Sequence, residues 1–332
     1  MSSPARSSVR PARARRVPPE AGLLLVVVLI LAAVALRPLL TGLLAKPAAA
    51  NWATVFIAVA VQAMPFLVLG VTVSGAIAAF VPPGALARLL PRRAALAVPA
   101  AATAGVALPG CECGSVPVAG RLVAAGVTPA AALAFLLSAP AINPIVLTAT
   151  AVAFPDHPVM VLARLVASLL ASIAVGMLWL VLGRDDLVRP ARRWEPPQGP
   201  RMRMFLASAQ HDFLQAGGFL VVGAGAAATL QTLVPRRIVD SFAHAGPLTV
   251  LALGVLAVLL ALCSEADAFV AAGLKQFSLT ARLAFLVVGP MVDVKLIALQ
   301  AGTFSPRFAW RFAPLTFAVA LVSAAVVGWW LL

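Results

Sequence analysis

Residues 133–145 read LAFLLSAPAINPI, and residues 283–295, 150 positions later, read LAFLVVGPMVDVK. Both stretches place proline and a polar residue inside an apolar run, and at this offset Asn143 corresponds to Asp293. Leucine, alanine and valine matches would mean little in an apolar chain. Proline and polar matches in the same order are far harder to obtain by chance, so these stretches indicate an internal repeat.

Matches elsewhere extend the repeat in both directions. FLVLG at residues 66–70 returns as FLVVG at residues 219–223, and Cys111 falls opposite Cys263. We therefore predict two membrane repeats, at residues 50–182 and 204–332.

Composition assigns both repeats to the membrane. Of the 332 residues, 62% are hydrophobic and only 11% are charged, and the mean hydropathy is +1.02. Soluble domains are nearer half apolar and a quarter charged. Apolar runs of roughly 20 residues, the length that spans a bilayer, recur along the chain. The sequence predicts an all-α polytopic protein with about seven to nine transmembrane helices in the lipid bilayer.

Charge indicates how the chain is organised. The formal net charge is +14, and arginines concentrate in residues 1–20 and 183–203. Because no basic face is interleaved with aromatic residues, we predict no nucleic-acid partner. We interpret residues 1–20 as a disordered basic cytoplasmic tail, 21–45 as an extra transmembrane helix and 183–203 as a cytoplasmic linker. The alternative for the N-terminus is a signal peptide with an apolar run at residues 22–36.

Residues 94–127 determine how the repeats are oriented. If this stretch folds back as a re-entrant hairpin, each repeat has three crossings and the two repeats are inverted, with a site near the midplane. If it crosses, the repeats are parallel. The arginine-rich linker favours the inverted arrangement, because a re-entrant hairpin keeps the linker in the cytoplasm.

The first group of chemically active residues interrupts that same stretch. It comprises Cys111, Glu112, Cys113, Gly114 and Ser115, which follow Pro109-Gly110. A carboxylate at membrane depth costs about 2.5–3.5 kcal/mol unless it faces a cavity or a partner. We predict an unwound, substrate-binding segment in which Gly114 also breaks the helix. The alternative is a helix break filled with small residues. A Cys-x-Cys pair lacks the usual spacing of a zinc site, and we predict no resident metal.

The second group lies at the equivalent place in the second repeat. Cys263 and Ser264 are predicted to bind substrate, and the neighbouring Glu265 and Asp267 to couple transport to an ion. The alternative is a polar helix cap.

The third group lies at the proline breaks of the opening stretches. Asn143 is predicted to contact substrate, and Asp293 and Lys295 are predicted to be coupling groups. Lys295 is expected to pair with Asp293, Asp267 or Glu265, which would balance charge in a low dielectric.

Four of these motifs together resemble the bacterial predicted-permease family, which includes the organoarsenical efflux permeases. They are CECGSVP at 111–117, SAPAINP at 138–144, CSEADAF at 263–269 and GPMVDVK at 289–295. The resemblance covers roughly residues 50–330. It implies a multi-pass secondary transporter of the cell inner membrane that moves a small solute or ion, with a trivalent organoarsenical or another thiophilic species as the finer expectation.

Enzymatic alternatives find no motif in the chain. There is no phosphate-binding Gly-x4-Gly-Lys loop, and the three histidines are isolated, so we predict no enzymatic activity and no cofactor. A thiol-based redox protein remains an alternative function. The sequence also leaves open a homo-oligomer or a membrane subunit that needs a partner protein.

The inverted arrangement predicts that the linker is cytoplasmic and that Leu332 is external. Reporter fusions at residues 195 and 332 measure this directly. Fusions that report the same side would refute three crossings in the second repeat.

Overall fold

The computed structural model describes residues 47–82, 85, 88, 90–91, 93–108, 111–183, 187–188, 199–233 and 248–332. From residue 51 to the C-terminus the chain forms one compact unit that contains both predicted repeats. The predicted tail 1–20, the predicted helix 21–45 and most of the linker 183–203 lie outside the described residues.

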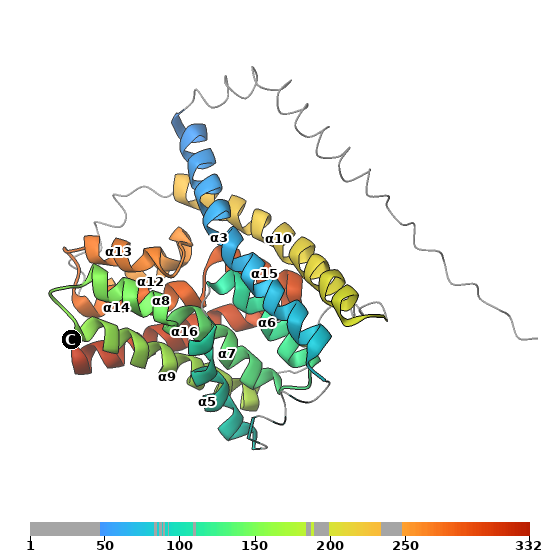
Figure 1. Ribbon diagram of the computed structural model, residues 1–332. Helices are drawn as coiled ribbons and strands as arrows, with labels where there is room; N and C mark the ends of the chain where they lie inside the picture. Colours follow the sequence, from blue (N-terminus) through green and yellow to red (C-terminus); the bar gives the residue numbers. More distant parts are fainter. Residues whose placement is uncertain are drawn as a thin grey trace, which may run out of the picture. The chain divides into compact units, whose positions relative to one another are not determined.

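Every regular element in the described ranges is helical, as Figure 1 shows. The first half contains α3 (Pro47–Phe80), α5 (Ala94–Ala104), the 3-10 turn η1 (Gly105–Ala107), α6 (Glu112–Ala124), α7 (Pro129–Ile142), α8 (Pro144–Ala153) and α9 (Val159–Leu182). The second half contains α10 (Arg201–Leu233), α12 (Leu248–Leu260), α13 (Ala266–Gly273), α14 (Leu279–Met291), α15 (Val294–Thr303) and α16 (Pro306–Leu331).

Six segments of the described chain are long and apolar enough to cross a bilayer. They are α3, α7 with α8, α9, α10, α14 with α15, and α16. The fold is therefore an all-α polytopic membrane architecture. The predicted segment 21–45 would bring the number of spans to seven. Crossings by α5 with α6 and by α12 with α13, which are not among the six, would bring it to nine.

The helices recur in the same order in the two halves. A long helix is followed by two short helices, a broken span and a final span. Equivalent helices meet across the halves, since α9 packs on α16 and α7 packs on α14. Non-equivalent helices pair reciprocally, with α8 on α13 and α15 on α6. This reciprocal pattern is what a pseudo-twofold relation between two repeats produces.

The broken spans form the centre of the unit. In an 18-residue apolar stretch of each span, the buried share is 78% for α7–α8 and 83% for α14–α15, but only 28–39% for the other four candidate spans. Apolar helices with so much exposed surface suit contact with lipid. On α16, the exposed side chains of Trp310 and Trp329 are 19 residues apart, about 29 Å along a helix, which matches the aromatic belts at the two faces of a bilayer.

Each central span breaks at its polar residue. The Asn143 side chain accepts a hydrogen bond from the Val146 backbone N–H at 3.0 Å and caps α8, and Pro144 begins that helix. Asp293 caps α15 in the same way through the Leu296 N–H. The caps satisfy backbone donors that would otherwise be unpaired in an apolar setting.

The segments that carry the cysteines are also broken, but one detail of the prediction is wrong. Gly114 does not unwind the chain, because it lies inside α6 in the turn that follows Cys111. Gly114 has another use. A Cβ on Gly70 of α3 would collide with the Gly114 backbone, so glycine at both positions lets α3 contact α6 closely.

Gly223, the repeat counterpart of Gly70, has a related role on α10. A Cβ there would lie 2.6 Å from the Lys295 Cα atom. The repeated FLVLG and FLVVG stretches therefore supply the contacts between the long helices and the broken elements.

We predict that Gly223→Ala lowers the free energy of unfolding by about 1–3 kcal/mol, because α15 must move to admit the methyl group. Thermal unfolding of the purified protein in detergent measures this. Gly225→Ala is the matched control, since nothing lies within 4 Å of its Cβ position. Equal melting temperatures for the two variants would contradict the proposed close contact.

Candidate functional site

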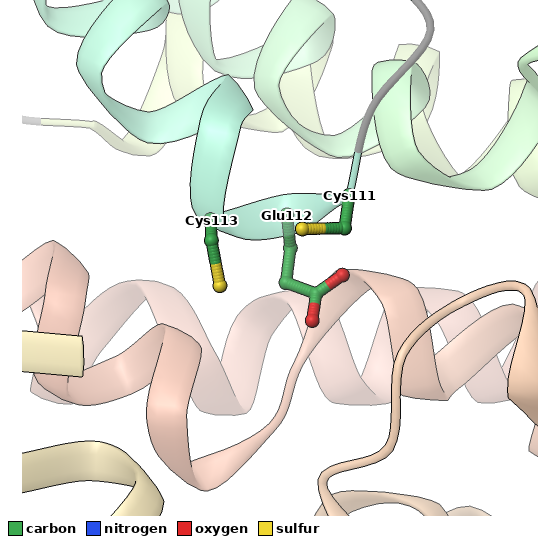
Figure 2. Close-up of side chains that lie close together, drawn as sticks. All are labelled: Cys111, Glu112 and Cys113. Atoms are coloured by element: carbon green, nitrogen blue, oxygen red, sulfur yellow. The ribbon is translucent and has the colours of Figure 1, made fainter. Parts of the chain in front are cut away.

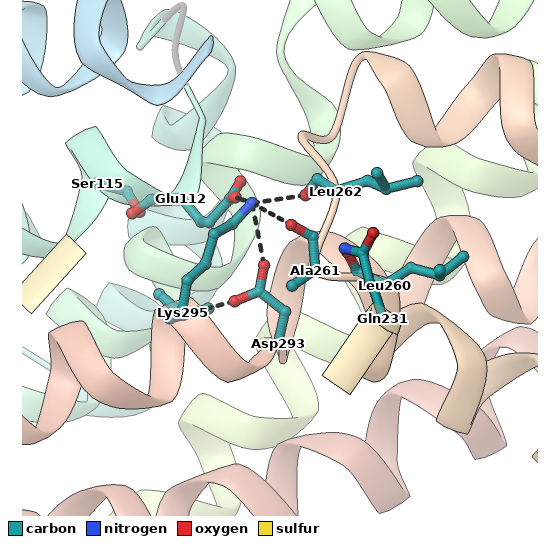
Figure 3. A network of polar contacts seen from close by, with 9 residues as sticks. Glu112, Ser115, Gln231, Leu260, Ala261, Leu262, Asp293 and Lys295 are labelled. Atoms are coloured by element: carbon teal, nitrogen blue, oxygen red, sulfur yellow. Dashed lines mark hydrogen bonds and ion pairs between the residues drawn. The ribbon is translucent and has the colours of Figure 1, made fainter. Parts of the chain in front are cut away.

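The ammonium group of Lys295 lies among four oxygen atoms, as Figure 3 shows. Its Nζ atom is 2.6 Å from Glu112 Oε1 and 3.2 Å from Asp293 Oδ2. It also donates hydrogen bonds to the carbonyl oxygens of Ala261 at 2.9 Å and Leu262 at 2.7 Å. One side chain thus joins the broken segment of the first repeat to two breaks in the second.

This charged cluster is almost completely buried. The exposed fractions are 2% for Lys295, 1% for Glu112 and 0% for Asp293. An isolated charge at such a site is very costly, and mutual pairing with further hydrogen bonds is what makes it tolerable. The one ammonium faces two carboxylates, one from each repeat.

Local backbone geometry explains how the cation is held. The positive φ of Ala261, 46°, ends α12 and turns its carbonyl and that of Leu262 toward the Lys295 Nζ atom. Asp293 is fixed by its capping bond and uses its second oxygen for the ammonium. The predicted pairing of Lys295 with Asp293 is therefore present in the structure, whereas its contact with Glu112 was not foreseen.

Three thiols gather beside this cluster. The side chains of Cys111, Glu112 and Cys113 lie close together (Figure 2). The two Sγ atoms and a carboxylate oxygen of Glu112 are all within 4.8 Å of one another. The Cys111 side chain also contacts that of Cys263 from the second repeat. All three cysteines are free and buried. The structure thus brings the thiols of both broken segments together.

Arg164 is a buried cation that our sequence reasoning missed. It lies on α9, is 0% exposed, and donates to Thr150 Oγ1 at 2.7 Å and to the Ser264 carbonyl at 3.0 Å. Its charge also interacts with Asp267 and Glu265. The available signal was a charged residue inside the apolar run 158–182, the same criterion that identified Glu112.

The remaining predicted residues divide into those already bonded and those with unused polar atoms. Ser115 donates to the Glu112 carbonyl at 2.9 Å, and Asn143 serves as a cap. Ser264 Oγ and Asp267 Oδ2 are buried without a hydrogen-bond partner among the described residues. Glu265, the residue that precedes α13, makes no side-chain capping hydrogen bond.

Comparison with known proteins places the chain in a family. A family model described as a predicted permease matches residues 48–329. The chain belongs to this predicted permease family.

Two relatives cover most of this permease. The UPF0718 protein YcgR of Bacillus subtilis (strain 168) is 36% identical over 278 residues, which are 82% of this chain and 94% of the relative. A protein of Streptococcus mutans serotype c (strain ATCC 700610 / UA159), named as a subunit of a two-component membrane permease complex, is 31% identical over 283 residues, with the same coverages of 82% and 94%. No solved structure gives a significant match.

Family membership and the six apolar segments identify a multi-pass membrane permease. The cluster of Glu112, Asp293 and Lys295, the three thiols, and Arg164 with its neighbours all lie on the breaks of this permease or against them. A transport protein has an evident use for polar groups at such breaks, because unwound backbone is tolerated at membrane depth where it is enclosed by protein or lines a cavity.

We predict that Lys295→Met lowers stability by about 3–5 kcal/mol, because it leaves two buried carboxylates without their cation. Thermal unfolding in detergent gives the loss, and Lys275→Met, at an exposed position, should change stability by less than about 0.5 kcal/mol. Adding Glu112→Gln should recover part of the loss. If the double variant loses the sum of the two single losses, the groups do not interact in solution.

Proposed function

We propose that this permease is a secondary transporter whose solute site lies where the broken segments of the two repeats meet. The observation that carries the proposal is the contact of Lys295 with Glu112, which joins a buried charge of one repeat to a buried charge of the other. Transporters built from repeats bind substrate at such junctions, where half-helices and unwound carbonyls meet. We further propose the bacterial inner membrane as its location.

For the substrate we propose a thiophilic species, with a trivalent organoarsenical as the first choice. Cys111, Cys113 and Cys263 supply three thiols from both repeats in one buried place. Soft thiolate ligands select soft substrates, and the nearby carboxylates can accept the protons that the thiols release. Glu112, Gly114, Ser115, Asn143 and Ser264 complete the proposed substrate-binding set.

For coupling we propose the buried charges of the second repeat, namely Glu265, Asp267, Asp293 and Lys295. Carboxylates at membrane depth are costly and commonly mark ion pathways. Support comes from the burial of Asp267 and Asp293, with exposed fractions of 2% and 0%. Among the described residues, no group donates a hydrogen bond to Asp267 Oδ2, so this atom is available to a coupling ion.

A second proposal is that the chain works together with a partner subunit. The Streptococcus mutans relative is named as one subunit of a two-component permease complex, and we propose that this chain too operates with a second subunit. Affinity purification of the tagged chain from its native membrane tests this proposal. Recovery of the chain alone, with full transport after reconstitution, would refute it.

The test of the substrate class is efflux of a trivalent methylarsenical from arsenical-sensitive cells and its uptake into everted vesicles. We expect the wild-type chain to protect the cells and the triple variant Cys111→Ser, Cys113→Ser, Cys263→Ser to lose protection, with single variants weakened. Full protection by the triple variant would refute thiol coordination. If the triple variant still transports a hard anion, a thiol redox function is also excluded.

The same vesicles, with a proton gradient imposed and then collapsed, test the coupling groups. Glu265→Gln, Asp267→Asn and Asp293→Asn should weaken the dependence of transport on the gradient while the protein remains inserted. An unchanged dependence in all three variants would remove these carboxylates from the mechanism.

A further inference from the structure

Arg164 belongs to the first repeat but contacts the second. It projects from α9 and donates to the backbone carbonyl of Ser264, 100 residues further along the chain, in the non-helical segment between α12 and α13. Its hydrogen bond to Thr150 on α8 is made within its own repeat. The guanidinium thus connects α8 and α9 to the segment that carries Cys263, Glu265 and Asp267.

The repeat provides a comparison for this side chain. Arg164 lies five residues after Val159, the first residue of α9, and Arg311 lies five residues after Pro306, the first residue of α16. Arg311 is exposed, whereas Arg164 is fully buried. An arginine that only marked the membrane surface would be exposed in both repeats. The burial of Arg164 therefore needs a partner, and the residues 264–267 supply it.

The contacts of residues 261–267 show how buried cations hold this segment in place. Lys295 holds the carbonyls of Ala261 and Leu262, and Arg164 holds that of Ser264. Two buried cations, one from each repeat, therefore bind carbonyls that have left the helical ladder. Asp267, at the other end, lies so close to α14 that a Cβ on Gly289 would be 2.6 Å from its Oδ2 atom. The Arg164 charge offsets the charge of this enclosed carboxylate.

We infer that Arg164 is a positioning residue of the transport site: by holding the Ser264 carbonyl from the opposite repeat, it sets the place of Cys263 and Asp267. The inference rests on the site proposed above. Arg164 acts through the backbone of residues 261–267 rather than by touching the solute.

Hydrogen–deuterium exchange of the purified full chain in detergent, without any solute, tests this directly. Arg164→Met should make backbone exchange in residues 261–267 about tenfold faster, because a charge-assisted hydrogen bond to that segment is lost. Arg164→Lys, which retains the charge, should restore part of the protection. Arg311→Met, the counterpart in the other repeat, should leave exchange in the segment unchanged.

A second comparison covers the case in which Arg164→Met fails to fold because Asp267 is left without its cation. Arg164→Met combined with Asp267→Asn removes both charges and should still exchange about tenfold faster in residues 261–267 than Asp267→Asn alone. The inference would be overturned if residues 261–267 exchanged within about twofold of the wild-type rate in Arg164→Met, and within about twofold of the Asp267→Asn rate in the double variant. Equal acceleration across α8 and α9 would also overturn it, because it would make Arg164 a packing residue of its own repeat. Failure of arsenical transport would leave these exchange results intact, so the two proposals fail separately.

Discussion

The constraint on which the rest of this structure depends is the burial of Lys295 in a medium that cannot solvate it. Lys295 is only 2% exposed, so protein oxygens must take the place of water around its ammonium group. These oxygens belong to Glu112, Asp293 and two backbone carbonyls. The two carbonyls are free because α12 ends at Leu260, and the two carboxylates lie at the starts of α6 and α15. The breaks and the charge are therefore mutually dependent, and the two repeats must meet for either to be stable.

The repeats share a scaffold but not a chemistry. Asn143 and Asp293 make the same helix cap, but only Asp293 also forms an ion pair, with Lys295. At the repeat offset of 150 residues, the position of Lys295 corresponds to the exposed Ile145. Within the described residues, the Glu112–Asp293–Lys295 cluster therefore has no counterpart around Asn143.

The contacts between the halves also limit how they can move. The Glu112–Lys295 ion pair, the Cys111–Cys263 contact and the Arg164 bond to Ser264 all cross from one repeat to the other. Any shift of one repeat against the other must break or exchange these buried interactions together. In a low dielectric that exchange requires a replacement partner, for which a solute or an ion from solution is the available source.

The sequence by itself determined the all-α membrane architecture, the repeat and the places where spans break. Apolar length, proline and the order of Asn143, Asp293 and the cysteines are local features that physical chemistry reads directly. It predicted Asp293 as a partner of Lys295, but not the contacts made over long distances in the sequence. Gly114 was assigned to a break although it provides a close helix contact, Glu112 was not paired with Lys295, and Arg164 was passed over in an apolar run. The partners of Glu112 and Arg164 in the second repeat lie 100 or more residues away along the chain, and only the packing of the two repeats brings them within bonding distance.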